Sequence, residues 1–225
     1  MTITLSEAES RRIMAAHGVP VSPFVTGHTT DEVIAALHGH PDLTFPLVAK
    51  LCGRSIAHKT ERGLVRLHLA DEPAVRSACD ELLARRQPDD GDVELLVSTM
   101  IAGNRELIAG LTTDPQFGMT VMVGIGGVLA EAIADVSFRL APLTEADAAE
   151  MINDLSSQRL LAPFRGEPAV DRDALTATLV ALSHLPDTEP TLRSADLNPL
   201  IITDGVPVAV DALVELADPS EIPDA

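Results

Sequence analysis

Apolar and polar residues follow one another along the chain in short blocks that predict several helices. Ser6 and Glu9 form a capping box, in which each side chain accepts a hydrogen bond from a backbone N–H at the start of a helix, and Gly18 ends that helix. Thr29 and Glu32 open a second helix in the same way. Similar patterns predict three further helices, over residues 72–86, 144–155 and 171–182.

Short apolar runs between these helices predict strands. Residues 47–51 form one such run, a loop follows from 52 to 62, and residues 64–69 alternate as a strand does. Later strands are expected over residues 93–100, 105–112, 119–123 and 128–140, with a closing β-hairpin over 194–213. Helices and strands are mixed without strict alternation, which favours α+β lobes over a doubly wound parallel sheet.

A polar stretch, residues 87–92, is the best boundary between two lobes. Its sequence, Gln-Pro-Asp-Asp-Gly-Asp, carries turn residues and nothing that a core would bury. A chain of 225 residues is long enough for one large domain or two small lobes. We therefore expect an N-terminal lobe over residues 1–92 and a C-terminal lobe over residues 93–225.

Composition and charge argue against a membrane-spanning protein and against a protein that binds nucleic acid. Apolar residues make up 46% of the chain, yet no apolar run reaches the roughly 18–20 residues of a membrane helix. A formal net charge of −18 opposes binding to nucleic acid or to anionic membranes. Residues 1–15 predict an amphipathic helix rather than a signal peptide, and Cys52 and Cys79 form no metal or redox motif. These features predict a cytoplasmic protein with reduced thiols.

Positive charge is concentrated in one segment of this acidic chain. Between residues 50 and 66 a single acid, Glu61, stands against five cations: Lys50, Arg54, Lys59, Arg62 and Arg66. Lys50 and Lys59 are also the only lysines of the chain, beside fourteen arginines. A lysine ammonium is a compact point charge that suits phosphate, so the segment indicates a bound anion. Ordinary scatter of surface charge is the alternative.

The closing hairpin carries a geometric argument for a metal site. Asp204-Gly205 is a strong two-residue turn signal, and with that turn the numbers of paired residues sum to 409. Asn198 then lies opposite Asp211, and Asp196 faces the same side of the sheet two residues earlier. Oxygen ligands of this kind suit Mg²⁺. The alternative is a polar cross-strand pair on a solvated face.

Nine short strings, spread over nearly the whole chain, carry a resemblance to a known family. They are VAK (48–50), IAHKTERG (56–63), GNRELIAG (103–110), DPQFG (114–118), GIGG (124–127), DVSFRLAPL (135–143), FRG (164–166), DLNPL (196–200) and AVDA (209–212). In this order they resemble the nucleotide-binding subunit of ADP-forming acetyl- and acyl-CoA synthetases.

The resemblance implies an ATP-grasp fold, in which two α+β lobes hold ATP between them. It implies the reaction acyl-CoA + ADP + phosphate ⇌ carboxylate + ATP + CoA, with Mg²⁺ and ATP or ADP bound to this chain. It also implies a hetero-oligomer with a CoA-binding, alpha-type partner subunit. That partner would form acyl phosphate and carry the phosphoryl group on its own histidine.

The resemblance assigns nucleotide contacts to particular residues. Lys50 would sit on the nucleotide phosphates, and Glu106 would hold the ribose hydroxyls. The adenine edge would be read by the backbone of Thr99, Met100, Ile101 and Ala102. Arg139 is a further candidate for contact with phosphate.

The remaining roles concern the metal and a histidine. Asn198 and Asp211 would hold Mg²⁺, in agreement with the hairpin argument, and Asp196 faces the same spot. His58 would be a second phosphoryl carrier or a phosphate contact, and Lys59 beside it would offset the charge of a phosphorylated imidazole. A lone histidine is more often structural, so this role depends on the neighbouring motif.

The chain departs from the family pattern at three positions. Thr99 stands where many ATP-grasp proteins have Glu, so ribose contacts are expected to be altered. Glu61 and Leu64 replace an Asp and a Gly of the histidine-containing motif, and Leu64 restricts the backbone of that loop. Phe117 and Phe138 are expected in the core rather than beside adenine.

Two other functions fit the same residues. One is a self-contained ATP-dependent carboxylate–amine or carboxylate–thiol ligase, and the other is a non-catalytic nucleotide sensor. The sequence shows neither a CoA-binding Rossmann unit nor an acyl pocket, which favours a subunit that acts with a partner over a complete ligase.

Overall fold

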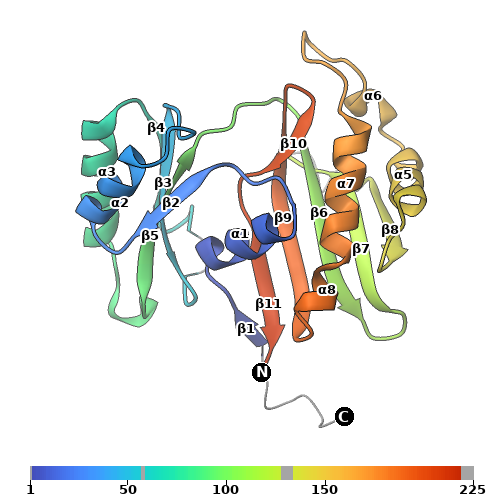
Figure 1. Ribbon diagram of the computed structural model, residues 1–225, viewed down its shortest axis with the longest axis horizontal. Helices are drawn as coiled ribbons and strands as arrows, with labels where there is room; N and C mark the ends of the chain where they lie inside the picture. The colour runs from blue at the N-terminus through green and yellow to red at the C-terminus, as the bar shows by residue number, and fades with distance from the viewer. Residues whose placement is uncertain (1, 57–58, 128–133, 219–225) are drawn as a thin grey trace. The chain divides into compact units, whose positions relative to one another are not determined.

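The structure, a computed structural model, describes residues 2–56, 59–127 and 134–218 of the chain (Figure 1). Internal contacts divide the chain into two compact units. Unit 1 consists of Met1–Thr4, Ser10–Val21 and Ile101–Ala225, and unit 2 consists of Leu5–Glu9 and Ser22–Met100. Helix α1, Glu7–Ala16, therefore gives its first turn to unit 2 and the rest of its length to unit 1.

Unit 2 is built on a four-stranded antiparallel sheet with the strand order β2–β5–β3–β4. The strands are β2 (Phe24–Gly27), β3 (Leu47–Gly53), β4 (Val65–Leu69) and β5 (Val93–Thr99). Strand β3 is buried at all seven positions because both of its faces are covered. One face packs on helices α2 (Thr30–His38) and α3 (Glu72–Ala84), and the other meets Ala8 of α1 through Cys52.

The helix starts of unit 2 follow the sequence signals. Ser6 N donates to Glu9 Oε2 at 2.8 Å and Glu9 N donates to Ser6 Oγ at 3.2 Å, which confirms the capping box. The Thr29 side chain accepts from Glu32 N at the start of α2. Helix α3 is capped by an Asp side chain instead, and a short 3-10 helix, η1 (Pro88–Asp90), precedes β5.

Unit 1 contains a seven-stranded antiparallel sheet. Its order is β1–β11–β9–β6–β7–β8, with β10 paired to β9 (Figure 1). The strands are β1 (Thr2–Thr4), β6 (Glu106–Asp114), β7 (Gly118–Ile125), β8 (Val136–Leu140), β9 (Leu192–Thr203), β10 (Val206–Ala209) and β11 (Leu213–Ala217). The alternation of buried and less buried residues along β6 and β9 shows that one sheet face forms the core.

Helices of unit 1 cover that buried face. They are α5 (Glu145–Asp154), α6 (Gln158–Leu161), α7 (Arg172–Ser183) and α8 (Leu185–Thr188), and in Figure 1 α7 runs along β6 and β7. Thr144 and Asp147 form a capping box at the start of α5, and Asp171 caps α7. Within the described ranges, no helix is both long and apolar enough to cross a membrane.

The α+β class agrees with this architecture, while several expected boundaries do not. Strand β5 hydrogen-bonds to both β2 and β3, so it belongs with the N-terminal sheet and the chain passes to unit 1 after Met100 rather than after residue 92. Strand β3 continues to Gly53, into the expected loop. Thr2–Thr4, expected to be helical, pairs with β11. Of the expected strand at 128–140, residues 136–140 form β8, and residues 128–133 lie outside the described ranges.

Candidate functional site

Both lysines of the chain bind one buried carboxylate in unit 2. Lys50 Nζ, on β3, donates to Glu7 Oε1 at 2.6 Å, and Lys59 donates to Glu7 Oε2. The side chains of Glu7, Lys50 and Lys59 are 1%, 10% and 19% exposed. These three groups, one carboxylate and two ammonium groups, have formal charges that sum to +1. The structure brings the two lysines of the basic segment to one carboxylate, that of Glu7, which the sequence had only placed in a helix.

Local structure explains why Glu7 reaches the lysines. The capping box fixes the first turn of α1, so Glu7 is the first helical residue and Ala8 packs against Cys52 of β3. Strand side chains alternate, so Lys50 lies on the same face of β3 as Cys52. Glu9, two residues after Glu7, binds Arg54 through contacts of 2.6–3.1 Å.

The segment after β3 is held to unit 2 by a second ion pair. The Arg62 guanidinium donates to both carboxylate oxygens of Asp90, at 2.7 and 3.0 Å, and the Asp90 side chain is 2% exposed. Arg62 holds the pKa of Asp90 below its usual range. Leu64, one of the departures from the family pattern, is 1% exposed and packs in the core of unit 2. His58 lies outside the described residues.

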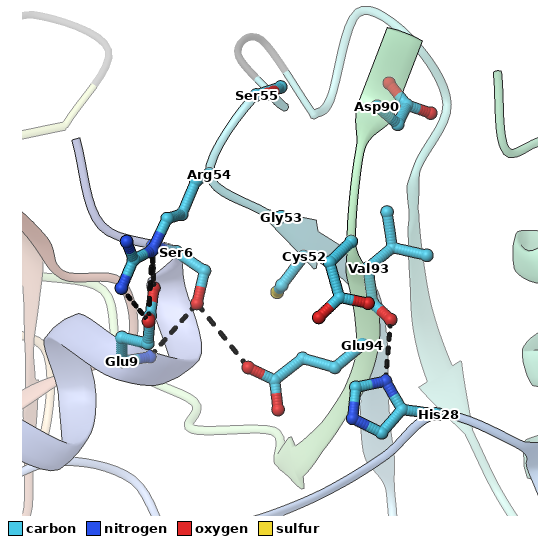
Figure 2. A pocket seen from close by; sticks show the side chains of 11 residues that line it. Ser6, Glu9, His28, Cys52, Gly53, Arg54, Ser55, Asp90, Val93 and Glu94 are labelled. Atoms are coloured by element: carbon cyan, nitrogen blue, oxygen red, sulfur yellow. Dashed lines mark hydrogen bonds and ion pairs between the residues drawn. The ribbon is translucent and has the colours of Figure 1, made fainter. Parts of the chain in front are cut away.

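A cavity of about 160 Å³ in unit 2 has an acidic lining that sequence reasoning missed (Figure 2). Its acidic residues are Glu9, Asp90, Asp92 and Glu94. His28 hydrogen-bonds through Nδ1 to Val93 O at 2.9 Å; this bond and the surrounding acids raise its pKa. Figure 2 shows Ser6 between Glu9 and Glu94, and Arg54 against Glu9. A phosphate would meet carboxylates here, so this cavity does not suit the predicted anion.

Two of the backbone N–H groups in the segment predicted to contact adenine already form hydrogen bonds within the protein. Thr99 N donates to Pro23 O and Met100 N donates to Pro46 O, both at 3.1 Å. These two N–H groups are therefore used inside unit 2. Any N–H donor to adenine along the predicted segment is then expected from Ile101 or Ala102.

Glu106, the predicted ribose ligand, lines a cavity of about 280 Å³ in unit 1. Gly126 N donates to Glu106 O at 2.8 Å, and a Cβ on Gly126 would lie 3.1–3.2 Å from the backbone of Glu106 and Leu107. The absence of a side chain at Gly126 thus permits the close approach of two chain segments. A Cβ on Gly127 would lie 3.8 Å from Glu106 Oε2, so this connection lies close to the Glu106 carboxylate.

One wall of this cavity is fixed by Arg105, which the sequence left without a role. The Arg105 side chain is 4% exposed and binds Glu167 Oε2 at 3.0 Å. It also donates to three backbone carbonyls, those of Leu160, Ala162 and Pro168. A buried guanidinium with this many partners holds the segment that carries Phe164 in one conformation. The string GNRELIAG contains Arg105, but its partners lie 55–63 residues away.

The hairpin has the register that the sequence predicted. The pairs run from Val206↔Thr203 to Ala209↔Leu200, and strand β11 resumes with Leu213↔Asp196. All of these pairs sum to 409. Asn198 and Asp211 lie between these pairs along the chain, and Asp196 and Asn198 both lie on the less buried face of β9.

On this face, Asp196 is close enough to Asp211 to be affected by its negative charge. Burial and the negative charge of Asp211 raise the pKa of Asp196 to about 6. A Cβ on Gly110 would lie 3.7 Å from Asp196 Oδ1, which places this carboxylate over β6. Among the described residues there is no group of three or more His, Cys, Asp or Glu that could hold a metal. The set of two carboxylates and one amide fits Mg²⁺, which keeps several positions for water and phosphate oxygens.

Arg139 and the two aromatic residues differ from expectation. Arg139 Nη2 binds Asp154 at 2.5 Å, so contact with a phosphate would require this pair to open. Phe117 and Phe138 are 68% and 53% exposed, which makes the expected core positions wrong. They lie at a shallow cavity with Arg139, on the sheet face opposite the helices.

The chain is similar in sequence to a known protein family and to characterised relatives. The model of the ATP-grasp domain family matches residues 2–216. The chain is also 34% identical over 211 residues to the beta subunit of acetate–CoA ligase [ADP-forming] I of Pyrococcus furiosus, a match that covers 92% of this chain and 90% of that subunit. The chain belongs to the ATP-grasp family, with the beta subunits of ADP-forming acetate–CoA ligases.

Two further similar proteins differ in how much of their length this chain covers. The chain is 33% identical to acetate–CoA ligase [ADP-forming] I of Archaeoglobus fulgidus over 94% of its own length but only 31% of that longer protein. A solved structure of the dinucleotide-forming acetyl-CoA synthetase 1 of Ca. Korarchaeum cryptofilum matches with a TM-score of 0.77 and 34% identity, covering 93% of this chain and 91% of that chain. That structure holds coenzyme A and Mg-AMPPCP, with a phosphohistidine segment pointing towards the nucleotide-binding site.

Proposed function

We propose that this chain is the nucleotide-binding subunit of an ADP-forming acyl-CoA synthetase and transfers a phosphoryl group between a phosphohistidine and ADP. The observation that carries the proposal is the match over 90% of the beta subunit of an ADP-forming acetate–CoA ligase. The lysine pair of unit 2 and the carboxylates of unit 1 supply the two charge types that phosphoryl transfer requires.

The overall reaction is acyl-CoA + ADP + phosphate ⇌ carboxylate + ATP + CoA. In the first step a phosphate oxygen attacks the thioester carbonyl, the C–S bond breaks, and CoA leaves as the acyl phosphate forms. A histidine nitrogen then takes the phosphoryl group and releases the carboxylate. Finally a β-phosphate oxygen of ADP attacks the phosphohistidine, which forms ATP and returns the free imidazole. We assign the first two steps to an alpha-type partner subunit and the last to this chain, in a hetero-oligomer.

In the last step, the residues of this chain bind and orient the nucleotide. Lys50 and Lys59 offset negative charge on the phosphates, as fixed donors in a site with little water. Glu106 holds the ribose hydroxyls. The adenine edge is read along Thr99–Ala102, with N–H donors at Ile101 and Ala102 and carbonyl acceptors at any of the four.

Mg²⁺ would be held by Asn198 and Asp211, with Asp196 beside them. The residues fit the ion because burial and the negative charge of Asp211 raise the pKa of Asp196, and a divalent cation beside it would stabilise its ionised form. When bound, Mg²⁺ neutralises charge on the phosphate oxygens. Arg139 would contact phosphate only in a state where its bond to Asp154 is broken.

The direct test is reconstitution with and without a CoA-binding partner. The isolated chain is expected to bind Mg-ATP, measured by calorimetry, and to form no acyl-CoA from carboxylate, ATP and CoA. Adding the partner should restore thioester formation and place acid-labile phosphate on the partner's histidine. Thioester formation by this chain alone would refute the proposal.

His58 is the second proposed carrier of the phosphoryl group. With the partner present, His58→Ala is expected to abolish turnover while Mg-ATP still binds, and acid-labile phosphate should appear on His58 of the wild-type chain. Near-normal turnover of His58→Ala would leave the relay to the partner's histidine alone.

A further inference from the structure

The carboxylate of Glu7 is the feature of unit 2 that the proposed reaction does not use. It lies 43 and 52 residues from its two partners and binds one lysine with each oxygen. With a side chain 1% exposed, it is the most deeply buried member of the cluster. We propose that Glu7 is a positioning residue that holds Lys50 and Lys59 as one phosphate-binding pair, an arrangement we call the Glu7 clamp.

Charge is the first reason for this role. Two buried ammonium groups close to each other repel, and burial penalises each charged form. A carboxylate between them offsets this repulsion, because it binds one ammonium group with each of its oxygens. Charge-assisted hydrogen bonds to both lysines also fix the positions of the two nitrogens.

Mobility is the second reason. A lysine side chain is a flexible four-carbon stem, and a free one would have to be ordered at each turnover. Lys50 is already fixed by β3, but Lys59 follows the strand in a turn region. Its backbone carbonyl accepts from Leu64 N at 2.8 Å, and its ammonium reaches back to α1. The Glu7 clamp therefore sets the position of Lys59, which is the neighbour of His58.

Two neighbouring carboxylates provide contrast. Glu9, in the same helical turn, binds Arg54, which is 57% exposed, and Asp90 binds Arg62. Each of these acids serves one arginine. Glu7 alone among the three serves both lysines of the chain. This assignment rests on the proposed function, since it gives the clamped lysines a role in phosphoryl transfer.

The first experiment tests the Glu7 clamp by NMR, without measuring enzyme activity. Selective ¹⁵N-lysine labelling of the full chain gives only two side-chain ammonium signals, because the chain has two lysines. Glu7→Gln is expected to shift both signals and speed their hydrogen exchange. Glu9→Gln, the matched control, preserves a capping box and should move neither. If Glu7→Gln leaves both signals in place, the clamp is wrong.

The second experiment measures how Glu7 affects phosphoryl transfer, through kcat and KM with the partner subunit present. Glu7→Gln is expected to lower kcat on the order of a hundredfold, since a small misplacement of a charged group costs about that much, while KM for the nucleotide changes much less. Lys59→Met should lower kcat similarly, and in the double variant the two losses should be clearly less than additive. Wild-type kcat in a folded Glu7→Gln chain, or fully additive losses, would overturn the positioning role.

A third variant covers the case in which Glu7→Gln does not fold. Glu7→Asp keeps the charge but shortens the reach by one methylene, so at least one ammonium signal should shift and kcat should fall; unchanged values of both would overturn the proposal. The two experiments also separate the inferences. If lysine variants leave nucleotide binding and transfer intact, the proposed use of the lysines fails, while the ammonium signals still decide whether the clamp exists.

Discussion

The two units of this protein hold their functional charges in opposite ways. In unit 2 the charges are positive and already paired within the protein, through the Glu7 clamp. In unit 1 they are carboxylates, and burial together with the negative charge of Asp211 raises the pKa of Asp196. Under the proposed function, the difference means that one unit would hold donors in place before an anion binds, whereas the other would be completed electrostatically by a divalent cation.

The same contrast appears in how each set of residues is built. The lysines depend on a carboxylate from a distant helix turn, so their geometry comes from packing of α1 on β3. The acids depend on a hairpin whose register is fixed by a two-residue turn. Changes to the two sets should therefore differ in kind as well as in size.

The largest effect is expected at Lys50. Lys50→Ala should lower phosphoryl transfer by at least on the order of a hundredfold and remove most nucleotide affinity, because a fixed buried donor is lost. Lys50→Arg should rescue poorly, since a planar guanidinium does not fit a point-charge site. Calorimetry with ATP and partner-dependent turnover measure both. Wild-type ATP binding in the Lys50→Ala variant would contradict the proposed role of the unit 2 lysines in binding phosphate.

A smaller, metal-dependent effect is expected at Asp211. Asp211→Asn should raise the Mg²⁺ concentration needed for half-maximal activity on the order of tenfold, because a hard cation loses one ligand charge. Asp204→Asn, in the exposed turn of the same hairpin, is the matched control and should leave the requirement unchanged. An unchanged Mg²⁺ requirement in Asp211→Asn would contradict the metal assignment.

The cores of the two units offer a test of stability. Leu95 in unit 2 and Leu179 in unit 1 are both fully buried. Replacing either by Ala should cost about 2–5 kcal/mol of unfolding free energy through the cavity that is left. Hydrogen exchange should show the loss mainly in the unit that carries the substitution. Equal loss of protection in both units would show that they unfold together.

The smallest effects concern pH, and they have opposite signs in the two units. Arg62 lowers the pKa of Asp90, so the stability from this carboxylate is complete above its ordinary value of 3.8 and is lost as pH falls through the lower folded value. Asp196 has a raised folded pKa of about 6, so stability linked to it is present at low pH and lost as pH rises through that value.

Two variants separate these contributions. Asp90→Asn should flatten the acid limb of the stability curve, and Asp196→Asn should flatten the region near pH 6 when no divalent cation is added. Thermal unfolding over a pH series measures both. If the two variants change the same limb, the opposite treatment of charge in the two units is refuted.

Much of the local structure could be predicted from the sequence, because its causes are local. The capping box of Ser6 and Glu9 and the turn at Asp204-Gly205 each act over a few residues, and both are present as expected. The hairpin register then followed by counting. The basic segment likewise showed in the sequence as a departure from an acidic background.

The features that were missed depend on distant parts of the chain. Strand β1 pairs with β11 across more than 200 residues, as in Thr2↔Ala217, and no local pattern reveals it. In the sequence, Glu7 looks like an ordinary acid in the first turn of a helix. Its contact with Lys50 shows only when α1 packs on β3 in the structure. The exposure of Phe138 also could not be read from its apolar character, since it depends on which sheet face the helices cover.

The choice of arginine over lysine has a chemical consequence for an enzyme of this reaction class. Thioesters and acyl phosphates react with free amines, and guanidinium groups, which stay protonated, are far poorer nucleophiles. Apart from the amino terminus, the chain has only two primary amines, and both are largely buried against Glu7. Its outer surface therefore presents few groups that its own high-energy acyl compounds could modify, and resistance to such self-acylation follows from the same two residues that are proposed to bind phosphate.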